Sequence, residues 1–316
     1  MNQMDKKKQK LVTVLGPTAV GKTKTSIELA KALDGEVISG DSMQIYRGMD
    51  IGTAKVTTEE MEGIPHHLID IKDPTESFSA AEFQKLATDL VADINSRGKV
   101  AIIAGGTGLY VKSVTHQYAF SEAKEDPVYR EKLERLAEEE GAVAFHSRMK
   151  EIDPVSYENV HPNNVRRVIR ALEVYHVTGE PVSASKDALP EHSPYHLVNV
   201  GLTMDRDLLY DRINRRVDLM MEAGLLEEAR ALHAEGVRDC QSVQAIGYKE
   251  IYRFIDGRVS YEDAVNELKQ NSRRYAKRQL TWFRHQMEMD WFDMTNDREE
   301  KIQTILQVVA GKLAES

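Results

Sequence analysis

The stretch from residue 16 to residue 23 constrains the fold more than any other part of the chain. It fits the phosphate-binding spacing G-x-x-x-x-G-K-[ST] and reads Gly16-Pro17-Thr18-Ala19-Val20-Gly21-Lys22-Thr23. An apolar run at 11–15 predicts a buried strand before it, and apolar residues at helical spacing over 25–33 predict a helix after it. This order of strand, glycine loop and helix predicts a parallel α/β sheet flanked by helices, with a P-loop.

The loop predicts a site for a polyphosphate. Successive backbone N–H groups and the start of the following helix are expected to face an anion. Lys22 is expected to neutralise phosphate oxygens, and the Thr23 hydroxyl to ligate a Mg²⁺ ion that bridges them. The alternative is a glycine-rich turn that binds nothing. The motif does not say which polyphosphate binds or which of its bonds breaks.

Two further strand ends carry candidate catalytic residues. Asp41 follows the short apolar strand predicted at 36–39, and Thr107 follows the continuously apolar run at 100–104. Ligands of open α/β sheets bind beyond the carboxyl ends of the strands, which favours a catalytic Asp41, although a capping aspartate is equally open. The glycines around Thr107 are expected to let a ligand approach the backbone. Many nucleotide hydrolases carry an aspartate there, so an ordinary ATPase is less favoured.

Composition sets the remaining bounds. The 316 residues are 41% hydrophobic, enough for one large domain with a second lobe. A single cysteine, Cys240, excludes an internal disulfide or a multi-cysteine zinc site and fits a reducing cytoplasm. No apolar stretch is long enough to span a bilayer, so we expect no membrane association. The net charge of −9 does not indicate a nucleic-acid binder, so the local distribution of charge has to decide.

The composition changes near residue 121, where charged residues at helical spacing replace strand patterns. We expect an α/β core at 1–120 and 198–316, with a helical insert at 121–197. Arg166, Arg167 and Arg170 lie on one helix of this insert, as candidate RNA contacts or as ordinary solvated charges. The adjacent histidines His66 and His67 are not expected to share a metal, because neighbouring side chains of an extended segment point opposite ways.

A basic segment lies at 268–285. It holds six Lys or Arg residues, including Lys277 and Arg278, and no Asp or Glu, with aromatic residues between the bases. Such a segment is typical of a surface that follows a nucleic-acid backbone. It equally fits a helix whose aromatic side chains are core and whose basic side chains are solvated.

Taken together, the motifs resemble those of the bacterial tRNA dimethylallyltransferase family. The segments that carry the resemblance cover nearly the whole chain and read, in order, GPTAVGKT, SGDSMQIYRGMDIGTAK, AGGTGLY, HPNNVRRVIRALEVY, AIGYKE and RRYAKRQLTWFR. The resemblance implies a P-loop, kinase-like core with an inserted helical domain. It also implies Mg²⁺-dependent transfer of a dimethylallyl group from dimethylallyl diphosphate to N6 of adenosine 37, beside the tRNA anticodon.

The resemblance also implies roles for individual residues. The P-loop holds the diphosphate leaving group, Arg212 helps to bind it, Asp41 accepts a proton from the adenine amine, and Thr107 positions the reacting groups. Contacts with the tRNA anticodon stem-loop are implied for Asp41, Ser42, Met43, Gln44, Thr107, Arg130, Arg166, Arg167, Arg170, Gly247, Tyr248, Lys249, Lys277 and Arg278. The chain departs from the family pattern at Arg166-Arg167, often Gln-Arg, and at Arg273-Arg274, often Arg-Gln.

Two other classes of protein share parts of this pattern. A P-loop small-molecule kinase would hold ATP in the same loop and would need no basic RNA surface. An RNA-binding protein could use the loop only to sense a nucleotide. We expect a monomeric, cytoplasmic transferase, without the C-terminal zinc finger of many eukaryotic members, because Cys240 alone cannot build one.

Overall fold

A computed structural model of the chain describes residues 8–120, 126–186 and 192–315. It divides into two compact units, one formed by 1–116 with 192–316 and the other by 117–191. The expected start of the insert at 121 lies outside the described residues. After the insert, the next strand of the sheet begins at His196, two residues before the expected return to the core at 198.

The first unit is built on a six-stranded parallel sheet with the strand order β3-β2-β4-β1-β5-β6. Its strands are β1 Lys10–Leu15, β2 Gly35–Ser39, β3 His66–His67, β4 Val100–Gly105, β5 His196–Thr203 and β6 Asp290–Asp293. The central strands β1 and β4 are buried on both faces, which explains their unbroken apolar sequences. The prediction of a parallel α/β sheet is confirmed.

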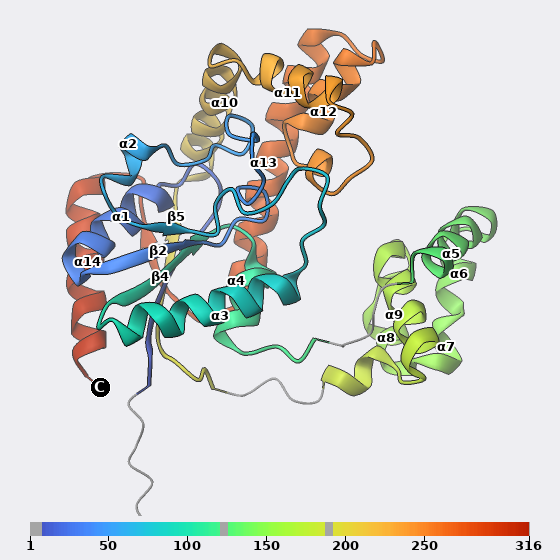
Figure 1. The fold of residues 1–316 in the computed structure, drawn as a ribbon, viewed down its shortest axis with the longest axis horizontal. Helices are drawn as coiled ribbons and strands as arrows, with labels where there is room; N and C mark the ends of the chain where they lie inside the picture. The colour runs from blue at the N-terminus through green and yellow to red at the C-terminus, as the bar shows by residue number, and fades with distance from the viewer. Residues whose placement is uncertain (1–7, 121–125, 187–191, 316) are drawn as a thin grey trace, which may run out of the picture. The chain divides into compact units, whose positions relative to one another are not determined.

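Helices cover both faces of this sheet, as Figure 1 shows. The helices of this unit are α1 Lys22–Leu33, α2 Thr58–Met61, α3 Ala80–Ser96, α4 Gly108–Thr115, α10 Arg206–Glu222, α11 Leu225–Ala234, α12 Tyr248–Ile255, α13 Tyr261–Gln286 and α14 Arg298–Ala314, with a 3₁₀ turn at Ser242–Gln244. Val12 and Val14 of β1 pack with the helices α1, α10 and α14. Leu11 and Leu15 point to the other face and pack with α3 and α4.

The order of the strands places the loops that carry the sequence motifs at one edge of the sheet. The P-loop follows β1, the turn at 40–46 follows β2, and the glycine-rich turn at 105–108 follows β4. The sheet order makes β1 and β2 the two neighbours of β4, and the carboxyl ends of parallel strands meet at one edge. The three loops are therefore adjacent, although more than 80 residues separate the first from the last.

The second unit is all-helical within the residues described, 126–186. It consists of α5 Pro127–Glu140, α6 Ala142–Ser147, α7 Met149–Ile152, α8 Pro154–Asn159 and α9 Val165–Thr178, followed by a 3₁₀ turn at Val182–Lys186. It has its own apolar core, in which Leu133 and Phe145 pack against Val168 and Leu172 of α9. Across the described part of the whole chain, no helix combines the length and the apolar character that a membrane crossing needs.

Candidate functional site

The P-loop has the backbone shape of an anion site. Gly16, Ala19 and Gly21 all have positive φ angles, 154°, 65° and 111°, which fold the loop back over the start of α1. The helix begins at Lys22, so the first N–H groups of α1 have no partner within the helix. The Lys22 ammonium group lies against the loop itself, 3.1 Å from the Gly16 carbonyl oxygen and 2.8 Å from that of Pro17.

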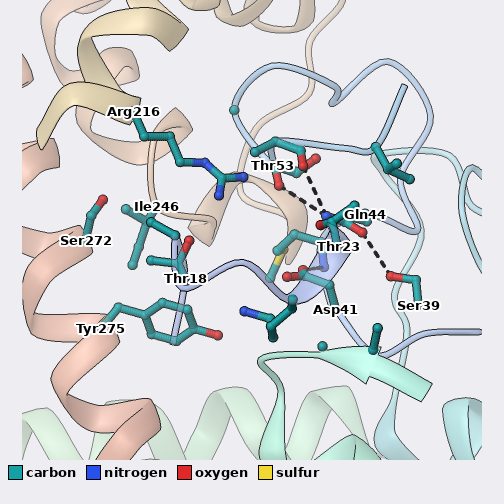
Figure 2. Close-up of a pocket in the computed structure, with 18 of the residues that line it drawn as sticks. Thr18, Thr23, Ser39, Asp41, Gln44, Thr53, Arg216, Ile246, Ser272 and Tyr275 are labelled. Carbon is teal, nitrogen blue, oxygen red and sulfur yellow. Dashed lines mark hydrogen bonds between the residues drawn. The ribbon is translucent and has the colours of Figure 1, made fainter. Parts of the chain in front are cut away.

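This loop forms one wall of a cavity of about 710 Å³. The P-loop lines it with Thr18, Ala19, Gly21, Lys22 and Thr23, whereas Val20 is fully buried beneath the loop. The other walls come from the turn after β2, the loop at 52–56, and the helices α10, α12 and α13. Figure 2 shows the Arg216 guanidinium and the Tyr275 hydroxyl pointing toward the middle of the cavity, where Asp41 lies.

Asp41 and Thr107, predicted as catalytic, both contact the turn after β2, but only Asp41 lines the cavity. Asp41 lines it, and its carboxylate accepts a hydrogen bond from the Met43 N–H at 2.9 Å. The Thr107 hydroxyl oxygen accepts from the Ser42 N–H at 3.1 Å and donates to the Ser42 hydroxyl at 3.3 Å. Each side chain therefore holds the 41–43 turn in shape, and one carboxylate oxygen of Asp41 has no hydrogen bond within the described residues.

Cationic side chains surround the same space. Burial lowers the pKa of Lys22 to about 8, against the opposing effect of Asp41, and Arg216 lowers it further. Burial likewise lowers the pKa of Arg216, and Asp41 opposes this too. Arg212 also lines the cavity, whereas Arg215 is exposed. The sequence prediction of Arg212 omitted Arg216, although their spacing of four residues puts both on one face of α10.

Two residues of α13 complete the site and were not predicted. The buried Gln279 accepts a hydrogen bond from the Thr18 N–H and donates one to the Gly106 carbonyl oxygen, both at 3.0 Å. Burial and the nearby Asp41 raise the pKa of the Tyr275 phenol to about 12, while hydrogen bonds with Thr107 and Gln279 lower it. The Tyr275 phenol is therefore neutral at physiological pH and available as a hydrogen-bond donor.

The glycines near Thr107 allow other parts of the chain to pack closely against the end of β4. They were predicted to let a ligand approach the backbone. A Cβ on Gly105 would lie 2.3 Å from the backbone of Gly40, one on Gly106 would lie 2.1 Å from the Gln279 amide, and one on Gly108 would lie 2.2 Å from the Trp282 ring. The glycines therefore let the residue after β2 and the helix α13 pack closely against the end of β4. Gly105 also lines the cavity, so the approach of a ligand to this backbone stays a prediction.

Some residues expected to contact tRNA instead form contacts within the protein. The Tyr248 side chain is 1% exposed, and its hydroxyl donates to Glu228 at 2.5 Å, so this tyrosine is core and not an RNA contact. Gly247 is buried, and Lys249 lines the cavity. The Gln44 amide accepts from the Ser39 hydroxyl and donates to the carbonyl oxygens of residues 53 and 54, contacts that Figure 2 marks.

The expected arginines of the insert fall into two groups. Arg130 and Arg170 both bind the fully buried carboxylate of Glu173, at 2.8 and 2.7 Å. Burial raises the pKa of Glu173, but the hydrogen bonds from the two arginines and from the Asp126 N–H outweigh it and leave the pKa below its usual value. Arg166 and Arg167 are exposed on α9, and neither forms an ion pair within the described residues. Only this second pair is available to a partner without breaking an internal contact.

The basic segment at 268–285 combines both interpretations left open by the sequence. It lies within α13, where Phe283 is buried in the core and Trp282 packs against it. Lys269 pairs with Asp218 at 2.5 Å, and Arg273 binds Asn214. Lys277 and Arg278 are exposed, and Arg278 also lines the cavity. Phe283 and Trp282 are therefore structural and Tyr275 lines the cavity, while part of the charge faces solvent beside the site.

The histidines behave as the sequence indicated. His66 donates to the carbonyl oxygen of Ile64, and His67 contacts Glu36, each at 2.8 Å, so the two rings do not converge. Among the residues that the structure describes, no group of three or more His, Cys, Asp or Glu side chains is placed to hold a metal ion. A metal in the cavity would therefore take most of its ligands from a bound molecule and water, in addition to the Thr23 hydroxyl predicted from the sequence.

Comparisons with known proteins agree on one family. The model of the IPP transferase family matches residues 44–286. A tRNA dimethylallyltransferase of Halalkalibacterium halodurans is 59% identical over 98% of this chain and 99% of its own length, and one of Bacillus cytotoxicus is 58% identical over 98% and 97%.

Solved structures agree as well. The tRNA isopentenylpyrophosphate transferase of Bacillus halodurans has a TM-score of 0.75 and 58% identity, with 98% of each chain covered. A eukaryotic dimethylallyltransferase described as acting on tRNA has a TM-score of 0.79 and 30% identity, over 91% of this chain and 74% of that one. The chain has a cavity at its P-loop, with Asp41 at a strand end beside it, and the family model matches most of its length. This chain therefore belongs to the IPP transferase family.

Proposed function

We propose that this protein transfers a dimethylallyl group from dimethylallyl diphosphate to N6 of adenosine 37 in tRNA and releases diphosphate. Full-length relatives at 59% identity carry the name tRNA dimethylallyltransferase, which favours prenyl transfer over the phosphoryl transfer of a kinase. The observation that carries the proposal is the cavity itself. It holds the cations Lys22, Arg212 and Arg216 together with the carboxylate Asp41.

The cationic wall fits a diphosphate leaving group. The free N–H groups at the start of α1 and the ammonium group of Lys22 would bind its oxygens, with the guanidinium groups of Arg212 and Arg216 opposite. These donors are fixed before the substrate arrives, so they stabilise the negative charge that grows as the allylic C–O bond breaks. They therefore favour departure of diphosphate as a whole.

The same cavity has an apolar part that fits the five-carbon chain. Val217 and Met220 of α10, Ile246 before α12 and Leu268 of α13 line it. A breaking allylic C–O bond leaves positive charge on carbon, which water would capture. Apolar side chains around the carbon chain would exclude water, so that the adenine amine is the nucleophile that reaches it.

The bond changes in this step balance between the two substrates and Asp41. The C–O electron pair leaves with the diphosphate, and the lone pair of the adenine N6 amine forms the new N–C bond. The amine then carries an extra proton, which the free carboxylate oxygen of Asp41 accepts. Thr107 would help by holding the turn that carries Asp41, through its two contacts with Ser42.

The donor set is also compatible with Mg²⁺. Magnesium in nucleotide sites draws one or two ligands from the protein and the rest from phosphate oxygens and water, which matches a site without a cluster of acidic side chains among the described residues. The Thr23 hydroxyl lines the cavity one residue after Lys22 and would supply a protein ligand. A bound Mg²⁺ would neutralise part of the diphosphate charge.

The exposed bases are the proposed contacts for the anticodon stem-loop. Arg166 and Arg167 present charge on the insert, and Lys277 and Arg278 present it on α13. Contacts of this kind bind phosphates and position the RNA without reading its sequence. We further propose that the enzyme works as a monomer in the cytoplasm.

A direct test incubates the protein with an anticodon stem-loop RNA, dimethylallyl diphosphate and Mg²⁺. We expect mass spectrometry to find one dimethylallyl group on the adenosine at position 37, and no product on an RNA with guanosine there. A protein that instead phosphorylates a small acceptor with ATP and leaves the RNA unmodified would contradict the proposal.

A further inference from the structure

The carboxylate of Glu228 on α11 accepts hydrogen bonds from three consecutive backbone N–H groups, in the loop that follows the turn at 40–46. Glu228 accepts from the Asp50 and Ile51 N–H groups at 2.9 Å with one oxygen, and from the Gly52 N–H at 3.0 Å with the other. Consecutive N–H groups that converge on one anion form a strong, charge-assisted contact. Glu228 therefore fixes the backbone of residues 50–52.

A buried tyrosine holds this carboxylate from the other side. The Tyr248 hydroxyl donates to Glu228 at 2.5 Å, and burial together with the Glu228 carboxylate raises the pKa of the phenol. The ring lies so close to Gly52 that a Cβ there would meet ring carbons at 2.5 Å. Through these hydrogen bonds, Glu228 on α11 connects the start of α12 to the 50–52 loop.

The fixed loop leads directly to the cavity. Gly52, Thr53 and Ala54 line it, and the carbonyl oxygens of Thr53 and Ala54 accept from the Gln44 side chain at 3.5 and 3.3 Å. Gln44 lies in the turn that also carries Asp41, and its amide oxygen accepts from the Ser39 hydroxyl at 2.9 Å. The path from Glu228 to this turn therefore runs through hydrogen bonds to residues 50–52, along the backbone to residues 53 and 54, and through hydrogen bonds to Gln44.

We propose that Glu228 is a positioning residue for the RNA substrate. It orders the 50–54 loop, and through Gln44 it orders the turn at 41–44 that would receive the adenine. Glu228 does not itself line the cavity, so it acts only through these contacts. This inference rests on the proposed function for its RNA substrate. It assigns the order of the loop to Glu228 of α11 and to Tyr248, neither of which lines the cavity.

The test compares Glu228→Gln with Glu227→Gln, which removes the same charge from the exposed neighbour on α11. An amide at position 228 would offer one acceptor oxygen and turn an NH₂ group toward the loop N–H groups. We expect hydrogen exchange of the amides at 50–52 to accelerate about tenfold or more in Glu228→Gln, and the KM for the stem-loop RNA to rise about tenfold. The dissociation constant for dimethylallyl diphosphate should change less than about twofold.

A second variant tests the same contact in case Glu228→Gln does not fold. Tyr248→Phe keeps the ring against Gly52 and removes only the hydroxyl, so we expect the same changes at about a third of the size. Unchanged exchange at 50–52 in both variants would overturn the proposal, as would equal losses of RNA and diphosphate affinity. If the unmodified protein fails to prenylate RNA, the proposed function fails, whereas the exchange data and the affinity for the stem-loop still decide the role of Glu228.

Discussion

The side-chain oxygen of Gln279 accepts a hydrogen bond from the main-chain N–H of Thr18 at 3.0 Å, which ties α13 to the P-loop. The same amide donates to the Gly106 carbonyl oxygen at 3.0 Å. One buried side chain therefore joins the loops that follow β1 and β4. Since α13 also carries Tyr275 and Arg278 to the cavity, this contact couples the P-loop to the helix with the exposed bases.

Replacing Gln279 by alanine should weaken the P-loop. Gln279→Ala leaves the Thr18 N–H and the Gly106 carbonyl oxygen without their partner, a cost of about 1–3 kcal/mol for each buried group that water does not reach. We expect a lower free energy of unfolding and weaker binding of dimethylallyl diphosphate, measured by denaturant titration and calorimetry. Gln270→Ala, at an exposed position of the same helix, is the matched control. Wild-type binding in Gln279→Ala would show that α13 does not shape the loop.

The affinity for diphosphate should depend on pH through Lys22. Its pKa is lowered to about 8, so in the free protein the ammonium group loses its proton as the pH rises through that value. The charged form binds the anion more tightly. Affinity should therefore be retained below pH 8 and fall above it, by up to about tenfold per pH unit. Calorimetric titration with dimethylallyl diphosphate at several pH values on both sides of pH 8 measures this change in affinity.

The control for this pH dependence is Lys22→Met, which keeps an unbranched side chain one atom shorter and removes its charge. It should bind dimethylallyl diphosphate weakly at every pH and lose the fall above pH 8. Ionisation of the diphosphate itself acts in the opposite direction, because a rising pH makes the ligand more negative. An affinity that rises steadily through pH 9 in the unmodified protein would therefore show that Lys22 does not titrate in the binding step.

Binding of tRNA should depend on Arg166 and Arg167 because they are exposed and form no ion pair with any residue that the structure describes. Replacing both by glutamine should weaken binding of the stem-loop and reduce the slope of log affinity against log salt by about one for each phosphate that the variant no longer binds. Fluorescence anisotropy at several salt concentrations measures both quantities. Arg135→Gln, on an exposed part of α5, is the control within the same unit. A slope equal to that of the control would make these arginines ordinary surface charges.

The position of the candidate site follows from sequence because of a property of parallel sheets. The carboxyl ends of neighbouring strands share one edge, so Asp41 and the P-loop could be placed together from two short apolar runs. The P-loop was predicted from its motif, the sheet from the apolar runs, and the insert from charged residues at helical spacing. The edge strand β6 was not, because four residues with aspartate at both ends carry little apolar pattern.

The side chains that complete the site could not be predicted in the same way. Gln279 lies within the segment RRYAKRQLTWFR, but only the packing of α13 on the strand ends shows that its amide meets Thr18 and Gly106. Tyr248 lies beside a lysine in a polar segment, and burial of the start of α12 removes it from the surface. Arg216, in contrast, could have been predicted, because its i, i+4 relation to Arg212 was visible in the sequence.

The central claim is that Asp41 accepts the proton of the attacking amine within a diphosphate-binding cavity. The Asp41→Asn variant keeps the shape of the side chain and the oxygen that accepts from the Met43 N–H, but it removes the base. Loss of a general base should act on the chemical step and not on binding.

The decisive measurement is the single-turnover rate of Asp41→Asn with saturating dimethylallyl diphosphate and stem-loop RNA. We predict a rate roughly 10²–10⁴ lower than that of the unmodified protein, with nearly unchanged affinity for dimethylallyl diphosphate. A near-normal rate of RNA prenylation in Asp41→Asn would contradict the account, because Asp41 would then only position the turn that carries it.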